Sequence, residues 1–237
     1  MQTTFRRYEK KYLITREQRS ALQALLPRYM SPDRFGEYLV QNLYYDTENW
    51  DCIRESIKKP CYKEKLRLRC YGVPNQNTEF FLELKKKFKE LVCKRRIAIP
   101  AQKFGGRTVR VIVAAEASQI GRELDFYLQS NAVSEKIYIS YNRTAFAGIK
   151  DEGLRVTFDT DIRFRQSGLD FFHPFDGKPV LPPGKTLMEV KTLGGMPVWM
   201  ARALSEYKIF PTAFSKYGVC YSDYIIKQPG RPVKISA

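Results

Sequence analysis

The sequence predicts an α+β fold in which antiparallel strands close into a β-barrel and helices pack outside it. The first observation is the segment Lys63–Arg69, where every second residue is basic and the residues between are mostly apolar. Such alternation is typical of a strand, because successive side chains point to opposite faces of a sheet. The second observation is that six other segments carry a similar charged stripe. Closing these strands into a barrel would gather the stripes in a wet, positive interior.

The other six stripes lie on predicted strands spread along the chain, and acidic residues stand among the basic ones. Basic side chains packed this closely require a polyanion, and the interspersed carboxylates indicate a divalent metal. The stripes are Arg7, Glu9 and Lys11 in Phe5–Ile14; Glu83, Lys85 and Lys87 in Phe80–Lys87; Lys94 and Arg96 in Val92–Ile99; Tyr141 and Arg143 in Ile137–Phe146; Arg155, Asp159, Asp161 and Arg163 in Leu154–Phe164; and Glu189 and Lys191 in Thr186–Leu193.

The first part of the chain alternates strands with helices. Phe5–Ile14 is the first predicted strand, and Thr15 with Gln18 then forms a capping-box pattern that starts a helix. Leucines at helical spacing continue this helix until Ser31–Asp33, where a proline stops it. The next predicted elements are a strand over Glu37–Tyr45 and a short helix over Glu48–Lys58.

The rest of the chain contains six more predicted strands and three more helices. Turn residues separate most of them, and the segment Ser167–Gly184, rich in proline and glycine, is predicted to run over the surface. The elements are three strands within Cys61–Pro100, a helix over Ser118–Ser130, strands over Lys136–Phe146, Leu154–Phe164 and Thr186–Leu193, a helix over Met196–Lys208, and a closing helix that buries Tyr217, Cys220, Tyr221 and Tyr224.

Length, charge and cysteine content limit the domain organisation, the class of partner and the cellular compartment that the sequence is compatible with. The 237 residues are expected to form one domain, 1–237, with a core over about 5–226 and a short basic tail. A formal charge of +16 favours nucleic acid, anionic lipid or a phosphorylated small molecule. Five cysteines without a Cys-x-x-Cys motif argue against disulfides and zinc, and favour the reducing cytoplasm. No apolar run reaches the roughly 20 residues of a transmembrane segment.

Eight short motifs follow one another in an order that resembles a known family. They are Arg7–Tyr12, Tyr44–Thr47, Lys65–Arg69, Leu82–Lys85, Tyr141–Phe146, Arg155–Asp159, Met188–Lys191 and Phe214–Tyr217. Together they resemble the VTC (vacuolar transporter chaperone) polyphosphate polymerase domain of the triphosphate tunnel metalloenzyme, or CYTH-like, superfamily. The resemblance implies an eight-stranded antiparallel barrel whose tunnel binds a triphosphate, with Mn²⁺ or Mg²⁺ as cofactor. It also implies transfer of the γ-phosphate of ATP to a growing polyphosphate chain.

The resemblance further implies roles for individual residues. The expected catalytic residues are Lys11, Arg67, Arg69, Lys85, Arg143 and Arg155. The expected phosphate-binding residues are Lys94, Arg96, Tyr141, Lys191, Ser215 and Lys216, and the expected metal ligands are Glu189, Glu9 and Glu83. The expected partners of the protein are ATP or another nucleoside triphosphate, and polyphosphate or triphosphate, but not DNA. A membrane-associated partner protein is also compatible with the resemblance. One departure is Ala213, where the family pattern has a further lysine.

The residue types themselves favour these roles, although each also has a structural explanation. Arginine can bind phosphate oxygens in a bidentate manner, which suits Arg67 and Arg69, whereas an isolated arginine is more often solvated or ion-paired. A carboxylate at Glu189 could bind a hard divalent cation or pair with Lys191 or an arginine. Glu9 and Glu83 could likewise bind the metal or form salt bridges with lysines of the tunnel. Ser215 and Lys216 could form an anion site or a simple helix cap.

Two other functions are compatible with the same residues. A tripolyphosphatase or nucleoside triphosphatase on this fold would need nearly the same triphosphate ligands and would use water as acceptor. A non-catalytic binder of polyphosphate or RNA would use the basic stripes but would have no need for Glu189. The chain lacks the paired stacking aromatics of an RRM motif, which disfavours that kind of RNA binding.

Overall fold

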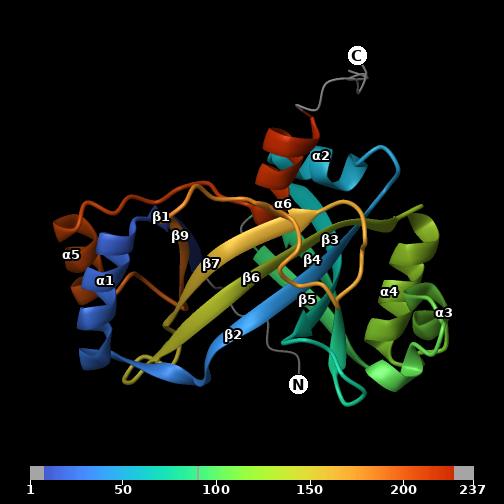
Figure 1. Ribbon diagram of the computed structural model, residues 1–237, viewed down its shortest axis with the longest axis horizontal. Helices are drawn as coiled ribbons and strands as arrows, with labels where there is room; N and C mark the ends of the chain where they lie inside the picture. The colour runs from blue at the N-terminus through green and yellow to red at the C-terminus, as the bar shows by residue number, and fades with distance from the viewer. Residues whose placement is uncertain (1–7, 90, 227–237) are drawn as a thin grey trace.

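The computed structural model describes residues 8–89 and 91–226, and one large antiparallel sheet lies at its centre (Figure 1). Eight strands form the path β1-β9-β7-β6-β2-β3-β4-β5, and the two-residue strand β8 pairs with β7. The predicted α+β class is confirmed. The strands are β1 (Tyr8–Ile14), β2 (Met30–Asp46), β3 (Tyr62–Tyr71), β4 (Glu79–Phe88), β5 (Leu91–Pro100), β6 (Ser134–Gly148), β7 (Arg155–Arg165), β8 (Lys178–Pro179) and β9 (Thr186–Thr192).

The sheet resembles a tunnel, but hydrogen bonds do not close it as a full barrel would require. Within the described residues, the path ends at β1 on one side and at β5 on the other. The free edge of β1 instead contacts the segment before the last helix, where the Thr212 amide donates to the Lys11 carbonyl at 2.7 Å. Charged side chains nevertheless interact across the gap between β1 and β4, which we call the seam. Burial raises the pKa of Glu9 on β1, but nearby lysines outweigh this effect and lower the pKa, and Lys85 on β4 contributes most among them.

Three groups of helices cover the sheet (Figure 1). Two helices pack over β1, β7 and β9, and two others pack over β3, β4 and β5. The third group stands at one end of the strands, where its aromatic side chains pack against residues of β2 and β6. The helices are α1 (Arg16–Leu25), α2 (Asp51–Ile57), α3 (Val109–Ala114), α4 (Gln119–Ser130), α5 (Val198–Glu206) and α6 (Lys216–Val219), with 3₁₀ turns at Leu26–Arg28 and Ala101–Lys103 and a π-helical segment at Cys220–Ile225.

Local sequence signals explain several element boundaries. The Gln18 amide donates to the Thr15 hydroxyl at 3.2 Å and the Thr15 amide donates to the Gln18 side chain at 2.9 Å, so the predicted capping box starts α1. Helix α2 is shorter than predicted, because the buried Asp46 carboxylate accepts the amides of Cys52 and Ile53 and fixes where the helix begins.

Strand β2 begins well before the position that the sequence predicted. It pairs with β6 on both sides of a bulge at residues 33–36, so the segment Ser31–Asp33, which was predicted to end the first helix, already lies within the strand. Gly36 supplies the left-handed backbone, φ +60°, that this bulge needs. Two other predicted features, residues 5–7 of the first strand and the tail beyond residue 226, lie outside the described residues. No helix in the described part of the chain is long and apolar enough to cross a membrane.

Candidate functional site

One face of the sheet gathers nearly all the charged side chains that the sequence singled out. Cross-strand register aligns them, since Arg67 lies opposite Glu83, Glu83 opposite Arg96, Lys11 opposite Glu189, and Arg143 opposite Asp159. We call this group the inner cradle. Its ten basic members outnumber its four carboxylates, and the members are Lys11, Lys65, Arg67, Arg69, Lys85, Lys94, Arg96, Arg143, Lys191 and Lys216 with Glu9, Glu83, Asp159 and Glu189.

Glu83 is the centre of one half of the inner cradle. Its carboxylate, only 1% exposed, lies 2.8 Å from Arg67 Nη2 and 2.5 Å from Lys94 Nζ. Arg69 and Arg96 approach the same carboxylate at 3.9 and 3.8 Å. Burial alone would raise the pKa of Glu83, but Arg67, Arg69 and Lys94 outweigh it and lower this pKa to about 2. Glu83 is therefore ionised at neutral pH and holds four basic side chains in place.

Glu189 is the centre of the other half. Its carboxylate lies 3.3 Å from Lys216 Nζ, 3.5 Å from Lys191 Nζ, 3.7 Å from Lys11 Nζ and 3.9 Å from Arg143 Nη2. Burial opposes ionisation, yet these cations hold the pKa of Glu189 well below its usual value. This carboxylate stays charged in a place where an unpaired charge would be unstable.

Asp159 is a member of the cradle whose structural role the sequence did not identify. It is fully buried and accepts two bonds from the Arg143 guanidinium, at 2.7 and 2.8 Å, and one from Lys216 Nζ at 2.6 Å. The buried lysine stays protonated, because Asp159 and Glu189 raise its pKa despite burial. Asp159 shares its predicted stripe with Arg155, but alternation within one strand cannot match it with Arg143 on β6 or Lys216 on α6.

Tyr141 connects the two halves of the cradle. Its hydroxyl accepts from Arg69 Nη2 at 3.4 Å, and its ring lies 5.2 Å from the Arg143 guanidinium carbon and 4.4 Å from Lys216 Nζ. Burial would raise the pKa of this phenol, but Arg143, Arg69 and Lys216 outweigh it and lower the pKa to about 8. The lowered pKa indicates how strongly positive the interior is.

The remaining predicted residues lie at the two ends of the cradle. Ser215 caps α6 and accepts a bond from Lys65 Nζ at 3.3 Å, while Lys85 faces Glu9 across the seam. Burial, together with Lys63 and Lys11, lowers the pKa of Lys65 to about 7. Arg155 is separate from the cluster, because its side chain is 48% exposed and pairs with Asp33 in the β2 bulge at 3.2 Å.

The carboxylates of the cradle can be compared with the needs of a metal. Among the described residues, no three His, Cys, Asp or Glu side chains gather closely enough to hold an ion alone. Glu9 and Glu189 do lie on neighbouring strands and share two lysines, since Lys11 and Lys191 each stand within 4.0 Å of both carboxylates. Mg²⁺ is commonly held by one or two carboxylates together with substrate phosphates, and this pair fits that pattern. The contacts of Glu83 are those of an ion-pair partner.

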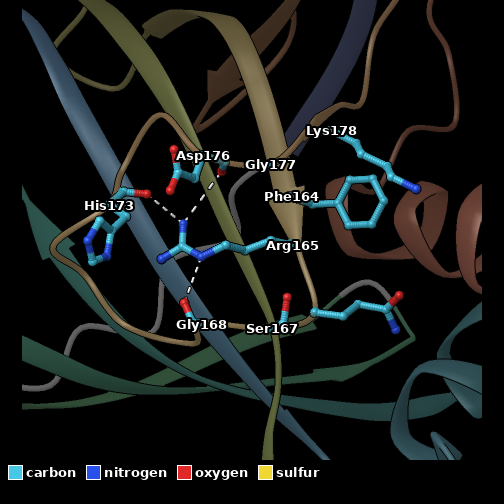
Figure 2. Close-up of a pocket in the computed structure, with 9 residues that line it drawn as sticks. Phe164, Arg165, Ser167, Gly168, His173, Asp176, Gly177 and Lys178 are labelled. Atoms are coloured by element: carbon cyan, nitrogen blue, oxygen red, sulfur yellow. Dashed lines mark hydrogen bonds between the residues drawn. The ribbon is translucent and has the colours of Figure 1, made fainter.

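A pocket of about 500 Å³ lies outside the cradle, under the loop after β7 (Figure 2). Figure 2 shows the Arg165 guanidinium at its centre, donating to the carbonyl oxygens of Gly168, His173 and Asp176. The same guanidinium stacks 3.7 Å from the Tyr138 ring. The N–H groups of Arg165 donate to backbone carbonyls, so this side chain holds the loop against the sheet. Few of its N–H groups remain free to bind a ligand.

Comparisons with known proteins agree with this geometry. A model of the VTC domain matches residues 6–224. Among solved structures, a candidate adenylate cyclase from Vibrio parahaemolyticus is 10% identical with a TM-score of 0.51, and the match covers 93% of this chain and 100% of that one. A candidate adenylyl cyclase from Hippeastrum, described as having a dominant triphosphatase activity, is 17% identical with a TM-score of 0.55, covering 89% and 93%. No curated protein matches the chain. At identities this low, the two matches show that this chain shares their fold.

Proposed function

Since this chain belongs to the VTC domain family, as the order of its motifs predicted, we propose that it extends polyphosphate with the γ-phosphate of ATP in a metal-dependent reaction. The observation that carries the proposal is the inner cradle, where ten basic side chains converge on four carboxylates. A cluster with such an excess of positive charge attracts a polyanion strongly, because the enclosed setting weakens screening by water. The reported triphosphatase activity of the Hippeastrum protein supports a triphosphate as that anion.

The residues of the cradle have the properties that phosphoryl transfer requires. This reaction needs little covalent help from protein and depends on positioning and on stabilising charge spread over the transferred oxygens. Arg67, Arg69 and Arg143 present planar donors already oriented by Glu83, Asn42 and Asp159. We propose that these guanidiniums bind and align the phosphates, while the lysines add point charges around them.

The proposed metal is Mn²⁺ or Mg²⁺, held by Glu189 and Glu9 together with phosphate oxygens. Such an ion, if bound there, would offset the negative charge of the phosphates. Lys11 and Lys191, which lie within 4.0 Å of both carboxylates, would turn toward the phosphates. Lys216 and Arg143 would keep Glu189 ionised and oriented for this task.

Hydrolysis of the triphosphate by water is the second candidate function, because the Hippeastrum protein has this activity on a similar fold. Product analysis after incubation with ATP and Mn²⁺ separates the two. Long-chain polyphosphate as the main product would support the polymerase, and free phosphate alone would support the hydrolase. Metal-independent binding of polyphosphate or RNA without any turnover would refute both enzymatic functions.

A further inference from the structure

The face of the sheet that carries the inner cradle changes its chemistry along the strands. On β3, Lys63 and Lys65 come first, Arg67 and Arg69 follow in the middle, and Tyr71 ends the stripe. On the antiparallel neighbour β4 the same order runs from Lys87 and Lys85 through Glu83 to Phe81. One end of the cradle is therefore rich in lysine, and the opposite end is aromatic.

Four aromatic side chains form a continuous row at this second end: Phe35, Tyr38, Tyr71 and Phe81. Neighbouring ring centroids are 6.1, 6.1 and 5.8 Å apart, and each pair meets edge to face. The row is partly open to solvent, since Phe35 is 60% exposed and Tyr71 is 39% exposed, while Tyr38 and Phe81 are half-buried. Large aromatic side chains that remain this open, next to a charged site, are better explained by a ligand than by the packing of a core.

A β-bulge in β2 places Phe35 at this end of the cradle. The bulge at residues 33–36 removes Asp33, Arg34 and Phe35 from the β2–β6 ladder, and the left-handed Gly36 returns the chain to the strand. Asp33 then pairs with Arg155, and the Arg34 guanidinium lies over the Phe35 ring at 4.6 Å. Bulges are frequent at barrel rims and beside active sites, where they redirect side chains.

The aromatic row is continuous with the proposed phosphate ligands. The Tyr71 hydroxyl accepts from Arg69 Nη1 at 3.4 Å, Tyr38 lies opposite Arg143 in the sheet, and the Arg96 guanidinium stacks on Phe81 at 3.5 Å. Tyr71 and Arg67 are four residues apart on one strand, a span of ~13 Å. That span leaves room for a ribose between a base on the aromatic row and phosphates on the arginines.

We propose that the aromatic row is a stacking platform for the base of the nucleoside triphosphate whose phosphates occupy the inner cradle. This inference rests on the proposed use of such a substrate. The lysine-rich end suits the highly charged polyphosphate, and the aromatic end is left for the only uncharged aromatic part of the nucleotide. Stacking on phenyl and phenol rings does not distinguish bases through hydrogen bonds, so ATP and GTP should bind with similar affinity.

The test compares ATP with inorganic tripolyphosphate, which has the phosphates but no base. Phe35→Ala should weaken ATP binding about 5- to 150-fold, equivalent to the ~1–3 kcal/mol of one base–aromatic stack, and leave tripolyphosphate affinity unchanged. Phe35→Trp should restore ATP binding. Phe126→Ala, which removes a 72% exposed phenylalanine on α4, is the matched control and should change neither affinity. Calorimetry gives both affinities directly.

Several results would overturn the platform. Equal weakening of ATP and tripolyphosphate by Phe35→Ala, or no weakening of either, would show that no base rests on the row. Binding of a single-stranded oligoribonucleotide without a triphosphate as tightly as ATP would assign the row to RNA instead. A wild-type protein that fails to bind tripolyphosphate would refute the proposed function itself, so the two proposals fail in different measurements.

Discussion

Replacing Glu189 by glutamine tests whether this carboxylate serves catalysis or only holds the cradle together. Glutamine keeps the shape of the side chain and removes its charge. The carboxylate lies 3.3–3.9 Å from the nitrogens of Lys216, Lys191, Lys11 and Arg143, so the substitution leaves those cations with one acceptor fewer. Asp159 remains bonded to two of the four, which should keep them in place.

The expected effect is large on turnover and small on binding. Removing one preorganised electrostatic group typically lowers turnover by roughly 10²–10³-fold, and loss of the proposed metal ligand belongs to this class. Affinity for tripolyphosphate should hold or increase, because the cradle loses a negative charge and keeps all ten basic side chains. The assay measures turnover of ATP with Mn²⁺ and, separately, tripolyphosphate affinity by calorimetry. Glu206→Gln, an exposed change on α5, is the control.

Two results would contradict this reasoning. Turnover close to wild type would reject Glu189 as a ligand that the reaction needs. Loss of turnover and of affinity together, in a variant whose circular dichroism shows a folded protein, would mean that Glu189 acts mainly as an ion-pair partner that organises the basic side chains.

Two further predictions concern binding. Arg67→Ala should weaken tripolyphosphate affinity by about 10- to 100-fold, as expected for the loss of charge-assisted hydrogen bonds. Lys58→Ala should have little effect, because Lys58 is exposed and pairs with Glu55. Equal effects of the two substitutions, measured by calorimetry, would reject the proposal that the phosphates bind in the inner cradle. The second prediction concerns pH. The pKa of Lys65 is about 7 in the free protein, mainly through burial, and a bound phosphate would raise it, so binding takes up a proton and affinity falls as pH rises from 7 to 9. Lys65→Met should flatten this slope, and calorimetry in buffers of different ionisation enthalpy should show fewer protons taken up by the variant; an unchanged proton count would contradict it.

Alternation made much of the architecture predictable. The charged stripes identified seven of the eight long strands, because a period of two fixes which residues share a face, and the capping box at Thr15 and Gln18 marked the start of α1. The longest strand, β2, carries no such stripe and was predicted only over Glu37–Tyr45. What alternation cannot show is which strands become neighbours and whether the sheet closes. The segment around Thr212 occupies the free edge of β1, a tertiary contact for which the sequence holds no local signal.

Most side chains of the inner cradle could be chosen from the sequence, but their pairing could not, and Arg155, which was also chosen, lies apart from them. Residues on one face of each strand could be chosen from the stripes, yet the partnership of Asp159 with Arg143 and Lys216 depends on register and on how α6 packs. Phe35 was missed for a related reason. Its position depends on the bulge that Gly36 permits, and bulges interrupt the very alternation from which the site was inferred.

A structure of the protein determined with tripolyphosphate and Mn²⁺ tests the central claim most directly. We expect the three phosphates between the two halves of the inner cradle, in contact with Arg67, Arg69 and Arg143, and the metal beside Glu189. Phosphates bound instead to exposed lysines outside the sheet, with the ion pairs of Glu83 and Glu189 undisturbed, would contradict the account.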